Sequence, residues 1–368
     1  MLDVVRQTQA AAELPIPPLA HETPCFVILE DAVRHNLERT AAAAGGVGRL
    51  MPHIKTHRAP WLIAAMLARG VGAFKCATPA EVEMALAAGA PHVVWAYPTA
   101  NRAAIARVIS AARAHPDARV DGLVDSTWGL AGWGTELHLQ PAANVWLRVD
   151  LDSGLGRTGV RLWTDAIELA RAVQQLRSMM RFAGFAGWHI YDGHIHDADR
   201  SVRAHRVDEL ATMLQSVLLL SEDLGGDVIA GGSYSFDLWP ADVARWVSPG
   251  SFTYSSAEHA ANLADLGWRI AGYVVASVIS THEGTATLDA GAKAISPDKP
   301  MKERFTGAGE IRFMNEEHVV VASDRLRVGE RVALVPRHAC TSAYLYDRAL
   351  VQGVDGAWEW REQMGARR

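Results

Sequence analysis

Short apolar runs alternate with helical stretches over residues 24–255 of this chain, and this alternation constrains the fold more than any other feature. Runs of this kind predict strands of a parallel sheet that is buried on both faces. Eight of them predict a (β/α)8 TIM-type barrel, with a doubly wound open sheet as the competing α/β fold. The apolar runs are 25–29, 50–54, 73–77, 92–96, 120–124, 145–149, 185–189 and 227–230, and the helical stretches are 33–44, 59–69, 80–88, 102–114, 164–176 and 201–224.

The character of the chain changes after about Ile270, where helical periodicity becomes scarce. Turn residues separate the β-rich runs 272–281, 285–289, 318–322 and 331–335. Strands that follow a completed α/β pattern predict a separate domain. We therefore expect a barrel over residues 20–258, and a β-rich domain made of residues 259–368 together with residues 1–19.

Composition bounds the class of protein. The chain has 368 residues, 49% of them hydrophobic, which is enough for a barrel and a second domain. A net charge of −5 without a basic stripe excludes nucleic acid as an expected partner. Three cysteines that lie far apart predict free thiols in a reducing compartment. The first 18 residues have no apolar signal-peptide core, and no uncharged run reaches membrane-spanning length, so we expect a cytoplasmic protein.

One lysine stands at a position suited to chemistry. Lys55 ends the second predicted strand, at the side of a barrel where catalytic groups concentrate. A lysine there, between His53 and His57, can form a Schiff base with a carbonyl cofactor. By position alone, the alternative is a solvated lysine that extends from a strand end.

The residues around this lysine resemble a known motif. Residues 52–57, Pro-His-Ile-Lys-Thr-His, resemble the cofactor-lysine motif of the D-serine dehydratase and D-threonine aldolase family. The resemblance implies the alanine racemase fold type, in which a barrel that binds pyridoxal 5′-phosphate (PLP) precedes a β domain. It also implies that Lys55 forms the aldimine. Further matches follow in the same order at 23–24, 77–81, 152–160, 231–233, 249–251, 289–291, 317–318 and 336–340.

A phosphate group needs several backbone N–H donors close together, which a glycine turn provides. The turn 231–233, Gly-Gly-Ser, follows the last predicted barrel strand, where barrels often bind phosphate. An ordinary strand-to-helix turn is the alternative. With the resemblance, the predicted cofactor-binding residues are Lys55, Arg157, Tyr191, Gly231, Gly232, Ser233, Tyr234, Gly250, Ser251 and Tyr254.

Two of these residues have alternatives of their own. Arg157 follows the sixth predicted strand, and the resemblance implies that it lies beside the cofactor; an ion pair with Asp150 or Asp152 is the alternative. Tyr191 follows the seventh predicted strand and matches a family tyrosine near the cofactor ring, whereas aromatic packing is its structural alternative. Together with Lys55 and His53, they are the predicted catalytic residues.

His338 and Cys340 form a candidate metal pair. If the segment stays extended, both side chains point to the same side, and imidazole with thiolate suits Zn2+. A buried histidine and a buried free cysteine are the alternative. The resemblance favours zinc, because dehydratases of the family carry His-x-Cys here. Aldolases of the family carry His-x-Asp and use Mn2+ or a similar ion, so Mn2+ is the second expected metal.

The resemblance implies a PLP- and metal-dependent lyase whose substrate is a small molecule, a D-configured β-hydroxy amino acid. In the first hypothesis Lys55 removes the α-proton and water is eliminated, as in D-serine and D-threo-3-hydroxyaspartate dehydratases. The alternative is retro-aldol cleavage to glycine and an aldehyde, as in D-threonine aldolase. A racemase and a non-catalytic PLP-binding protein are more distant alternatives. We expect a homodimer, because in this fold type the β domain of one subunit closes the barrel of the other.

Overall fold

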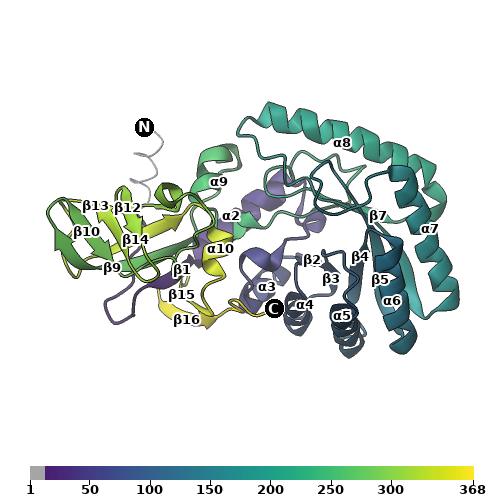
Figure 1. Ribbon diagram of the computed structural model, residues 1–368, viewed down its shortest axis with the longest axis horizontal. Coiled ribbons are helices and arrows are strands. Elements are labelled where there is room, and N and C mark those ends of the chain that lie inside the picture. Colours follow the sequence, from purple (N-terminus) through teal and green to yellow (C-terminus); the bar gives the residue numbers. More distant parts are fainter. Residues whose placement is uncertain (1–12) are drawn as a thin grey trace. The chain divides into compact units, whose positions relative to one another are not determined.

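The computed structural model describes residues 13–368 of the chain, so the expectation for residues 1–12 lies outside the described part. The chain separates into two compact units, each built on one sheet (Figure 1). Residues 41–55 and 60–250 form the first, which we call the barrel unit. Residues 13–40, 56–59 and 251–367 form the second, which we call the β unit.

The sheet of the barrel unit has seven strands that follow one another in chain order, all parallel. Most of their residues are buried, as expected of strands covered on both faces. The strands are β2 (Phe74–Cys76), β3 (His92–Trp95), β4 (Arg119–Val124), β5 (Ala142–Leu151), β6 (Phe182–Ile190), β7 (Asp227–Ala230) and β8 (Trp246–Val247).

Residues 50–53 close this sheet into a barrel. Leu50 forms a parallel bridge with Val247 of β8, and His53 forms one with Lys75 of β2. The N–H of Met51 donates to Val247 O at 2.9 Å, and the N–H of Lys75 donates to Pro52 O at 2.9 Å. The segment is therefore the eighth parallel element, and the predicted (β/α)8 barrel is confirmed.

The prediction was wrong about one barrel strand. Cys25–Leu29, expected as the first, is β1 of the β unit, where it lies between β9 and β15. Four of the five residues of β1 are buried in this sheet, so its apolar run looks like that of a barrel strand. The strand missing from the prediction is β8, whose two residues are too few to give an apolar run. The predicted start of the barrel at residue 20 therefore assigned β1 to the wrong sheet.

Helices cover the outside of the barrel (Figure 1). Helix α6 was not predicted, because Gly129, Gly132 and Gly134 lower its intrinsic helix propensity. Its N-cap Ser126 accepts a hydrogen bond from Gly129 N–H at 3.1 Å, which fixes its start. The helices are α3 (Pro60–Leu67), α4 (Pro79–Ala87), α5 (Arg102–Ala114), α6 (Thr127–Leu139), α7 (Trp163–Met179) and α8 (Arg200–Leu220).

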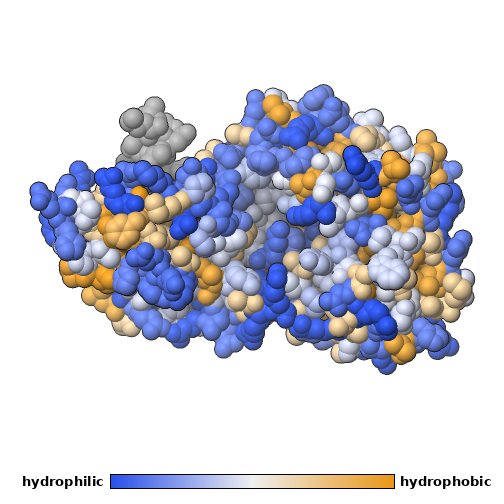
Figure 2. Space-filling model, viewed as in Figure 1, coloured by the Kyte–Doolittle hydropathy of each residue, from blue (hydrophilic) through white to orange (hydrophobic). Residues whose placement is uncertain are grey.

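The outer surface of these helices is mixed. Figure 2 shows hydrophobic residues interspersed with hydrophilic ones over the barrel unit. Met179 at the end of α7 and Leu219 at the end of α8 are largely exposed. Exposed apolar side chains of this kind are ordinary on helix surfaces. In the described part of the chain, no helix has both the length and the hydropathy that a membrane span requires.

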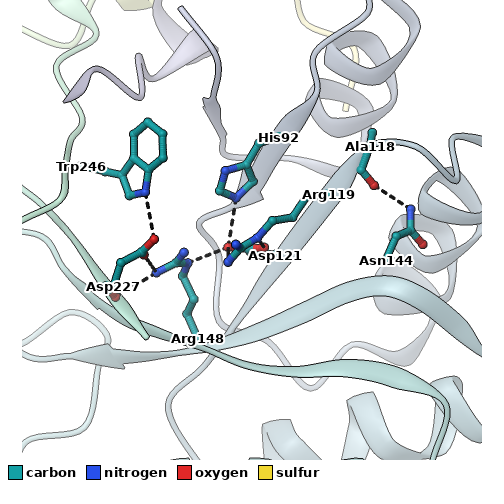
Figure 3. A network of polar contacts seen from close by, with 8 residues as sticks. All are labelled: His92, Ala118, Arg119, Asp121, Asn144, Arg148, Asp227 and Trp246. Carbon is teal, nitrogen blue, oxygen red and sulfur yellow. Dashed lines mark hydrogen bonds and ion pairs between the residues drawn. The ribbon is translucent and has the colours of Figure 1, made fainter. Parts of the chain in front are cut away.

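A network of charged side chains fills the amino-terminal end of the barrel (Figure 3). Asp121 of β4 accepts hydrogen bonds from Arg148 Nε at 2.7 Å and from Arg119 Nε at 2.7 Å. Arg148 also lies 2.6 Å from Asp227 Oδ1, and Trp246 Nε1 donates to Asp227 Oδ2 at 3.1 Å. The network thus ties β4, β5, β7 and β8 together inside the barrel.

The β unit is built on a nine-stranded sheet with the order β12-β13-β10-β9-β1-β15-β16, while β14 pairs with β9 and β11. All pairings are antiparallel except that of β1 with β15. The strands are β1 (Cys25–Leu29), β9 (Gly272–His282), β10 (Thr285–Leu288), β11 (Phe305–Thr306), β12 (Ile311–Met314), β13 (Val319–Ala322), β14 (Arg331–Pro336), β15 (Arg348–Gln352) and β16 (Trp358–Glu362).

The core of the β unit lies where its central strands meet, with Val27, Tyr273, Val275 and Leu350 all buried. The four predicted β-rich runs are β9, β10, β13 and β14, so the expected C-terminal β domain is confirmed. Three helices complete the description: α2 (Glu30–Ala43), α9 (Ala257–Asn262) and α10 (Ala339–Ala343). The cysteines at 25, 76 and 340 are all free, as expected.

Candidate active site

Lys55 lies just beyond the closing segment of the barrel, in the middle of a single 3-10 turn, η2 (Ile54–Thr56). The segment before it is held on both sides, since the N–H of His53 donates to Pro249 O at 3.0 Å and His53 pairs with Lys75. The Lys55 side chain itself is exposed. The amine therefore stands at the carboxyl end of the barrel strands, where TIM-barrel enzymes have their active sites.

The ring of Tyr191, just after β6, gathers three cationic side chains. Arg157 Cζ lies 4.9 Å from the ring centroid, Lys75 Nζ 5.4 Å and Lys55 Nζ 5.9 Å. Each distance is within the range of cation–π attraction. The structure thus brings together Lys55, Arg157 and Tyr191, three of the residues predicted from the sequence, and adds Lys75.

The loop around Tyr191 has little space for other side chains. A Cβ on Gly232 would lie 3.2 Å from Tyr191 Cε2, and one on Gly193 would lie 2.4 Å from Tyr191 Cε1. Ser153 Oγ donates to the backbone oxygen of Tyr191 at 2.6 Å. Two glycines and one hydroxyl therefore fix where the ring lies.

Arg157 does not form either of the ion pairs considered from the sequence. Asp150 accepts from Thr158 Oγ1 at 2.9 Å, and Asp152 accepts from the N–H groups of Gly154 and Gly156, each at 3.0 Å. Within residues 13–368, no ion pair joins Arg157 to either carboxylate. Its guanidinium faces the Tyr191 ring instead, so its charge is directed toward the candidate site.

Asp150 and His189 form a buried pair between neighbouring strands. Asp150 Oδ1 lies 2.6 Å from His189 Nδ1, and both side chains are 4% exposed. Burial, followed by the nearby charge of Lys75, lowers the pKa of His189 to about 4. Burial and the charges of Lys55 and Lys75 likewise hold the pKa of His53 well below its usual value. Both imidazoles are therefore neutral near pH 7.

Lys75 is a residue of the candidate site that the sequence analysis missed. It belongs to β2, where the apolar run 73–77 predicted only a strand. The residue is 3% exposed, and among the described residues no hydrogen bond or ion pair involves its ammonium. Burial, followed by repulsion from Lys55, lowers its pKa to about 7. The available signal was a lysine inside a fully buried strand, since lysines are almost never buried without a partner.

The predicted phosphate turn lies at the same end of the barrel. Gly231 has φ of +75°, a left-handed conformation that favours glycine. Ser233 Oγ accepts from Gly250 N–H at 3.3 Å, so the turn after β7 lies beside the end of β8. With the corrected strand count, these are the loops after the seventh and eighth barrel elements, which hold phosphate in many barrels. Tyr234 belongs to the same turn, and its ring lies 6.4 Å from that of His196 in an edge-on contact.

Four of the residues predicted from the sequence belong to the β unit: Ser251, Tyr254, His338 and Cys340. Cys340 Sγ lies 3.2 Å from Thr56 Oγ1 and 3.9 Å from Ser251 Oγ. Tyr254 is fully buried, and its hydroxyl has no hydrogen-bond partner among the described residues. A buried hydroxyl without a hydrogen-bond partner costs folding free energy.

His338 and Cys340 are not arranged as predicted. The chain does not stay extended after β14, because His338 is the N-cap of α10 and Cys340 lies in its first turn. The two side chains nevertheless meet: burial opposes protonation, but hydrogen bonds to Cys340 and Asp298 raise the pKa of His338 to about 9. Asp298 Oδ2 lies 2.5 Å from His338 Nδ1. Within the described residues, no group of three or more His, Cys, Asp or Glu is placed to hold a metal, so the pair supplies a partial ligand set.

The residues at the end of the barrel fit PLP chemically. The phosphate and phenolate of PLP are anionic, and Lys55, Lys75 and Arg157 supply positive charge around one ring. Gly231 and Gly232 form a turn that a side chain would obstruct, since a Cβ on Gly231 would lie 3.1 Å from Trp239. This end of the barrel therefore has an amine for covalent attachment and a glycine turn of the kind that holds phosphate.

A parallel barrel that carries these groups at its carboxyl end, with a separate β unit, is the fold type of alanine racemase. The chain belongs to the family described as "Alanine racemase, N-terminal domain", whose model matches residues 28–258. Residues 271–352 match a second model, described as "Putative serine dehydratase domain". The resemblance inferred from the sequence motifs is therefore confirmed.

Named relatives extend over almost the whole chain. The D-threo-3-hydroxyaspartate dehydratase of Delftia sp. (strain HT23) is 26% identical over 383 residues, covering 93% of this chain and 97% of the relative. The 3-hydroxy-D-aspartate aldolase of Paracoccus denitrificans is 24% identical, covering 89% and 87%. The crystal structure of D-threonine aldolase from Filomicrobium marinum is 25% identical with a TM-score of 0.83, covering 96% and 98%.

Proposed function

We propose that this protein is a PLP- and metal-dependent lyase that acts on D-configured β-hydroxy amino acids by removing the α-proton and eliminating water. The observation that carries the proposal is the meeting of Lys55, Arg157 and Tyr191 at the carboxyl end of the barrel. The named relatives are two lyases of 3-hydroxyaspartate and one D-threonine aldolase, and all three substrates are D-β-hydroxy amino acids.

PLP, when bound, would supply the electron sink that stabilises negative charge at the substrate Cα. Lys55 Nζ would attach it covalently and then, once free, accept the α-proton. The exposed position of Lys55 in a short turn allows its amine to reach both partners. The residues that would hold the cofactor are Lys55, Arg157, Tyr191, Gly231, Gly232, Ser233, Tyr234, Gly250, Ser251 and Tyr254.

Arg157 and Tyr191 would orient the bound ring rather than exchange protons. Arg157 is exposed, and its guanidinium lies over the Tyr191 ring, so it can donate hydrogen bonds to an anionic oxygen. His53 is neutral and buried, and Nδ1 of its ring has no hydrogen-bond partner among the described residues. We assign it a supporting role near Lys55, where it can donate or accept one hydrogen bond.

His338 and Cys340 would hold a divalent metal, for which Zn2+ is favoured because a thiolate is a soft ligand. The metal would supply Lewis acidity at the substrate hydroxyl. The contact of Asp298 with His338 Nδ1 fits this role, because metal-binding histidines usually donate their second nitrogen to a carboxylate. Mn2+ is the second candidate.

Retro-aldol cleavage to glycine and an aldehyde is the second candidate function. The names of the aldolase relatives favour it, and the identities of the dehydratase and aldolase relatives to this chain are similar, at 26% and 24%. Cys340 favours the dehydratase, because aldolases of the family carry aspartate at its position. This one ligand position is what distinguishes the two candidates.

We further propose that the protein is a cytoplasmic homodimer. Three free cysteines, two of them buried, support a reducing compartment. The dimer is the expectation of the fold type, and sedimentation velocity of the holoenzyme would test it, with a monomer at micromolar concentration as the contrary result.

The decisive experiment incubates PLP- and Zn-loaded protein with D-serine, D-threo-3-hydroxyaspartate and D-threonine, while ammonia, 2-oxo acid, aldehyde and glycine are all measured. We expect ammonia and 2-oxo acid in equal amounts from at least one substrate. Aldehyde and glycine instead would establish the aldolase. The Lys55→Ala variant should lose the visible absorbance of bound PLP, and the exposed Lys302→Ala variant should keep it; retention in Lys55→Ala would refute the assignment of Lys55.

A further inference from the structure

A second lysine points into the same site and has no counter-charge of its own. Lys75 is the middle residue of β2 and is 3% exposed. Its Nζ nevertheless lies 5.4 Å from the centroid of the Tyr191 ring. The ring attracts a cation only weakly, even when water is excluded. A buried ammonium that lacks a carboxylate partner costs much more than this.

Two carboxylates, Asp150 and Asp192, attract the ammonium of Lys75, but each has its contacts elsewhere and neither forms an ion pair with it. Asp150 accepts hydrogen bonds from Thr158 and contacts His189 at 2.6 Å. Asp192 accepts from Trp239 Nε1 at 2.8 Å, and burial raises the pKa of its carboxyl. Neither carboxylate forms an ion pair with Lys75, so the protein leaves the positive charge of Lys75 to be balanced from outside.

We propose that Lys75 binds an anionic oxygen of a ligand inside the barrel. This inference rests on the proposed function, because the two possible sources of such an oxygen are the cofactor and the substrate of that function. One is the bound PLP, which carries a phosphate and a phenolate oxygen. The other is a second carboxylate on the substrate, which the relatives named for 3-hydroxyaspartate handle and the one named for D-threonine does not.

The charges around Lys75 make its ligand binding depend on pH. Lys55 and Arg157 repel its ammonium from the loops after the closing segment and β5, while Asp150 of β5 and Asp192 after β6 attract it. His53 and His189 face it from the closing segment and β6, and both are neutral. The balance lowers the pKa of Lys75 to about 7 without a ligand. An anion favours the charged form, so binding above pH 7 takes up a proton, and affinity falls as the pH rises.

Binding measurements on Lys75→Met, Lys75→Arg and the control Lys302→Met test the proposal without any turnover. Lys302 is exposed and pairs with Glu310 at 2.9 Å, outside the barrel unit. PLP affinity is measured by titrating apoprotein and following visible absorbance. Succinate and propionate are titrated into the holoprotein as a dicarboxylate and a monocarboxylate that cannot react.

The two sources give different results. If PLP supplies the oxygen, Lys75→Met binds PLP at least tenfold more weakly, while the ratio of succinate to propionate affinity does not change. If the substrate supplies it, PLP affinity is kept and succinate affinity alone falls at least tenfold. Either result supports the proposal. Unchanged affinities for all three ligands in a folded Lys75→Met protein would overturn it.

A measurement on the wild-type protein covers the case in which Lys75→Met does not fold. PLP is titrated into the apoprotein and succinate into the holoprotein by calorimetry, in two buffers of different ionisation enthalpy. For the ligand that Lys75 binds, proton uptake on binding should be larger at pH 8 than at pH 6. Lys75→Arg should bind the same ligand without this extra uptake at pH 8. Equal proton uptake at pH 8 and pH 6 in the wild-type protein contradicts the proposal. The same uptake in Lys75→Arg as in the wild-type protein also contradicts it. The proposed function fails separately, through lack of product or through PLP that stays bound in Lys55→Ala. A wild-type protein that binds neither PLP nor succinate overturns both.

Discussion

Gly193 lies so close to Tyr191 that a Cβ added to it would be 2.4 Å from Cε1 and 2.5 Å from the hydroxyl oxygen of that ring. No pair of heavy atoms tolerates this distance without a bond or a hydrogen bond, so the ring takes its present position only beside a glycine. Because Lys55, Lys75 and Arg157 all face the ring, Gly193 indirectly sets the geometry of the candidate site.

The Gly193→Ala variant should therefore displace Tyr191 and weaken cofactor binding. We expect the dissociation constant of PLP to rise about tenfold, which corresponds to about 1.4 kcal/mol, with a much smaller change in thermal midpoint. Gly72→Ala is the matched control, because nothing lies within 4 Å of a Cβ at that exposed position. Equal PLP affinity in both variants would show that the ring position does not matter for the cofactor.

The sequence predicted the barrel well because parallel strands need continuous apolar runs, and residues 93–95 and 228–230 show such runs clearly. The two strand errors have different causes: a buried apolar run does not show to which sheet its strand belongs, and a very short strand gives no run at all. β1 therefore entered the wrong sheet, while β8, with only two residues, was invisible. Strand pairing depends on contacts between distant residues, such as Val27 with Leu350, which no local pattern contains.

The candidate metal pair gives a second prediction. Cys340→Ala should lower the zinc content after loading and desalting by about tenfold or more, because a partial ligand set loses its only thiolate. Cys25→Ala removes a free cysteine from the core of the same unit and should leave the zinc content unchanged. Plasma mass spectrometry measures both. Full zinc content in Cys340→Ala would place the metal elsewhere or exclude it.

The candidate site was predicted only in part, because local sequence patterns do not show which side chains meet across the barrel. Motif resemblance identified Lys55, Arg157 and Tyr191, and the fold brings them together at one ring. Lys75 was missed, because inside an apolar run its chemistry was masked by its neighbours Phe74 and Cys76. What places it in the candidate site is its contact with the ring of Tyr191, a residue that follows β6 and lies far from Lys75 in the sequence.

The charged network at the other end of the barrel gives a prediction about stability. Arg148 is fully buried between Asp121 and Asp227, so Arg148→Met leaves two carboxylates without this partner. We expect a loss of about 3–5 kcal/mol in the free energy of unfolding, the usual effect of breaking a buried pair. Denaturant titration of the holoprotein measures it.

Arg107→Met is the control for the network, because Arg107 pairs with Glu83 at 2.6 Å on the surface, where both side chains are exposed. The Arg107→Met variant should lose between about 0 and 1 kcal/mol of unfolding free energy. A similar loss in both variants would mean that the buried network adds no stability beyond that of an ordinary surface pair.

Buried histidines predict how stability depends on pH. The pKa of His189 is about 4, lowered mainly by burial, and that of His259 is also about 4 for the same reason. Each native pKa lies below the unfolded value of about 6.5, so the unfolded state binds a proton first as the pH falls.

The contribution of each neutral histidine to the free energy of unfolding is complete above pH 6.5 and is lost as the pH falls toward 4, at about 1.4 kcal/mol per pH unit. In His189→Gln the loss of unfolding free energy between pH 6.5 and pH 4.5 should be smaller than in the wild-type protein by the share of one histidine. His205→Gln, which changes a surface histidine beside Glu209, should keep the wild-type slope. Denaturant titrations at four pH values over this interval give both slopes, and identical slopes in wild-type and His189→Gln would mean that His189 takes up its proton at the same pH in the folded and unfolded chains.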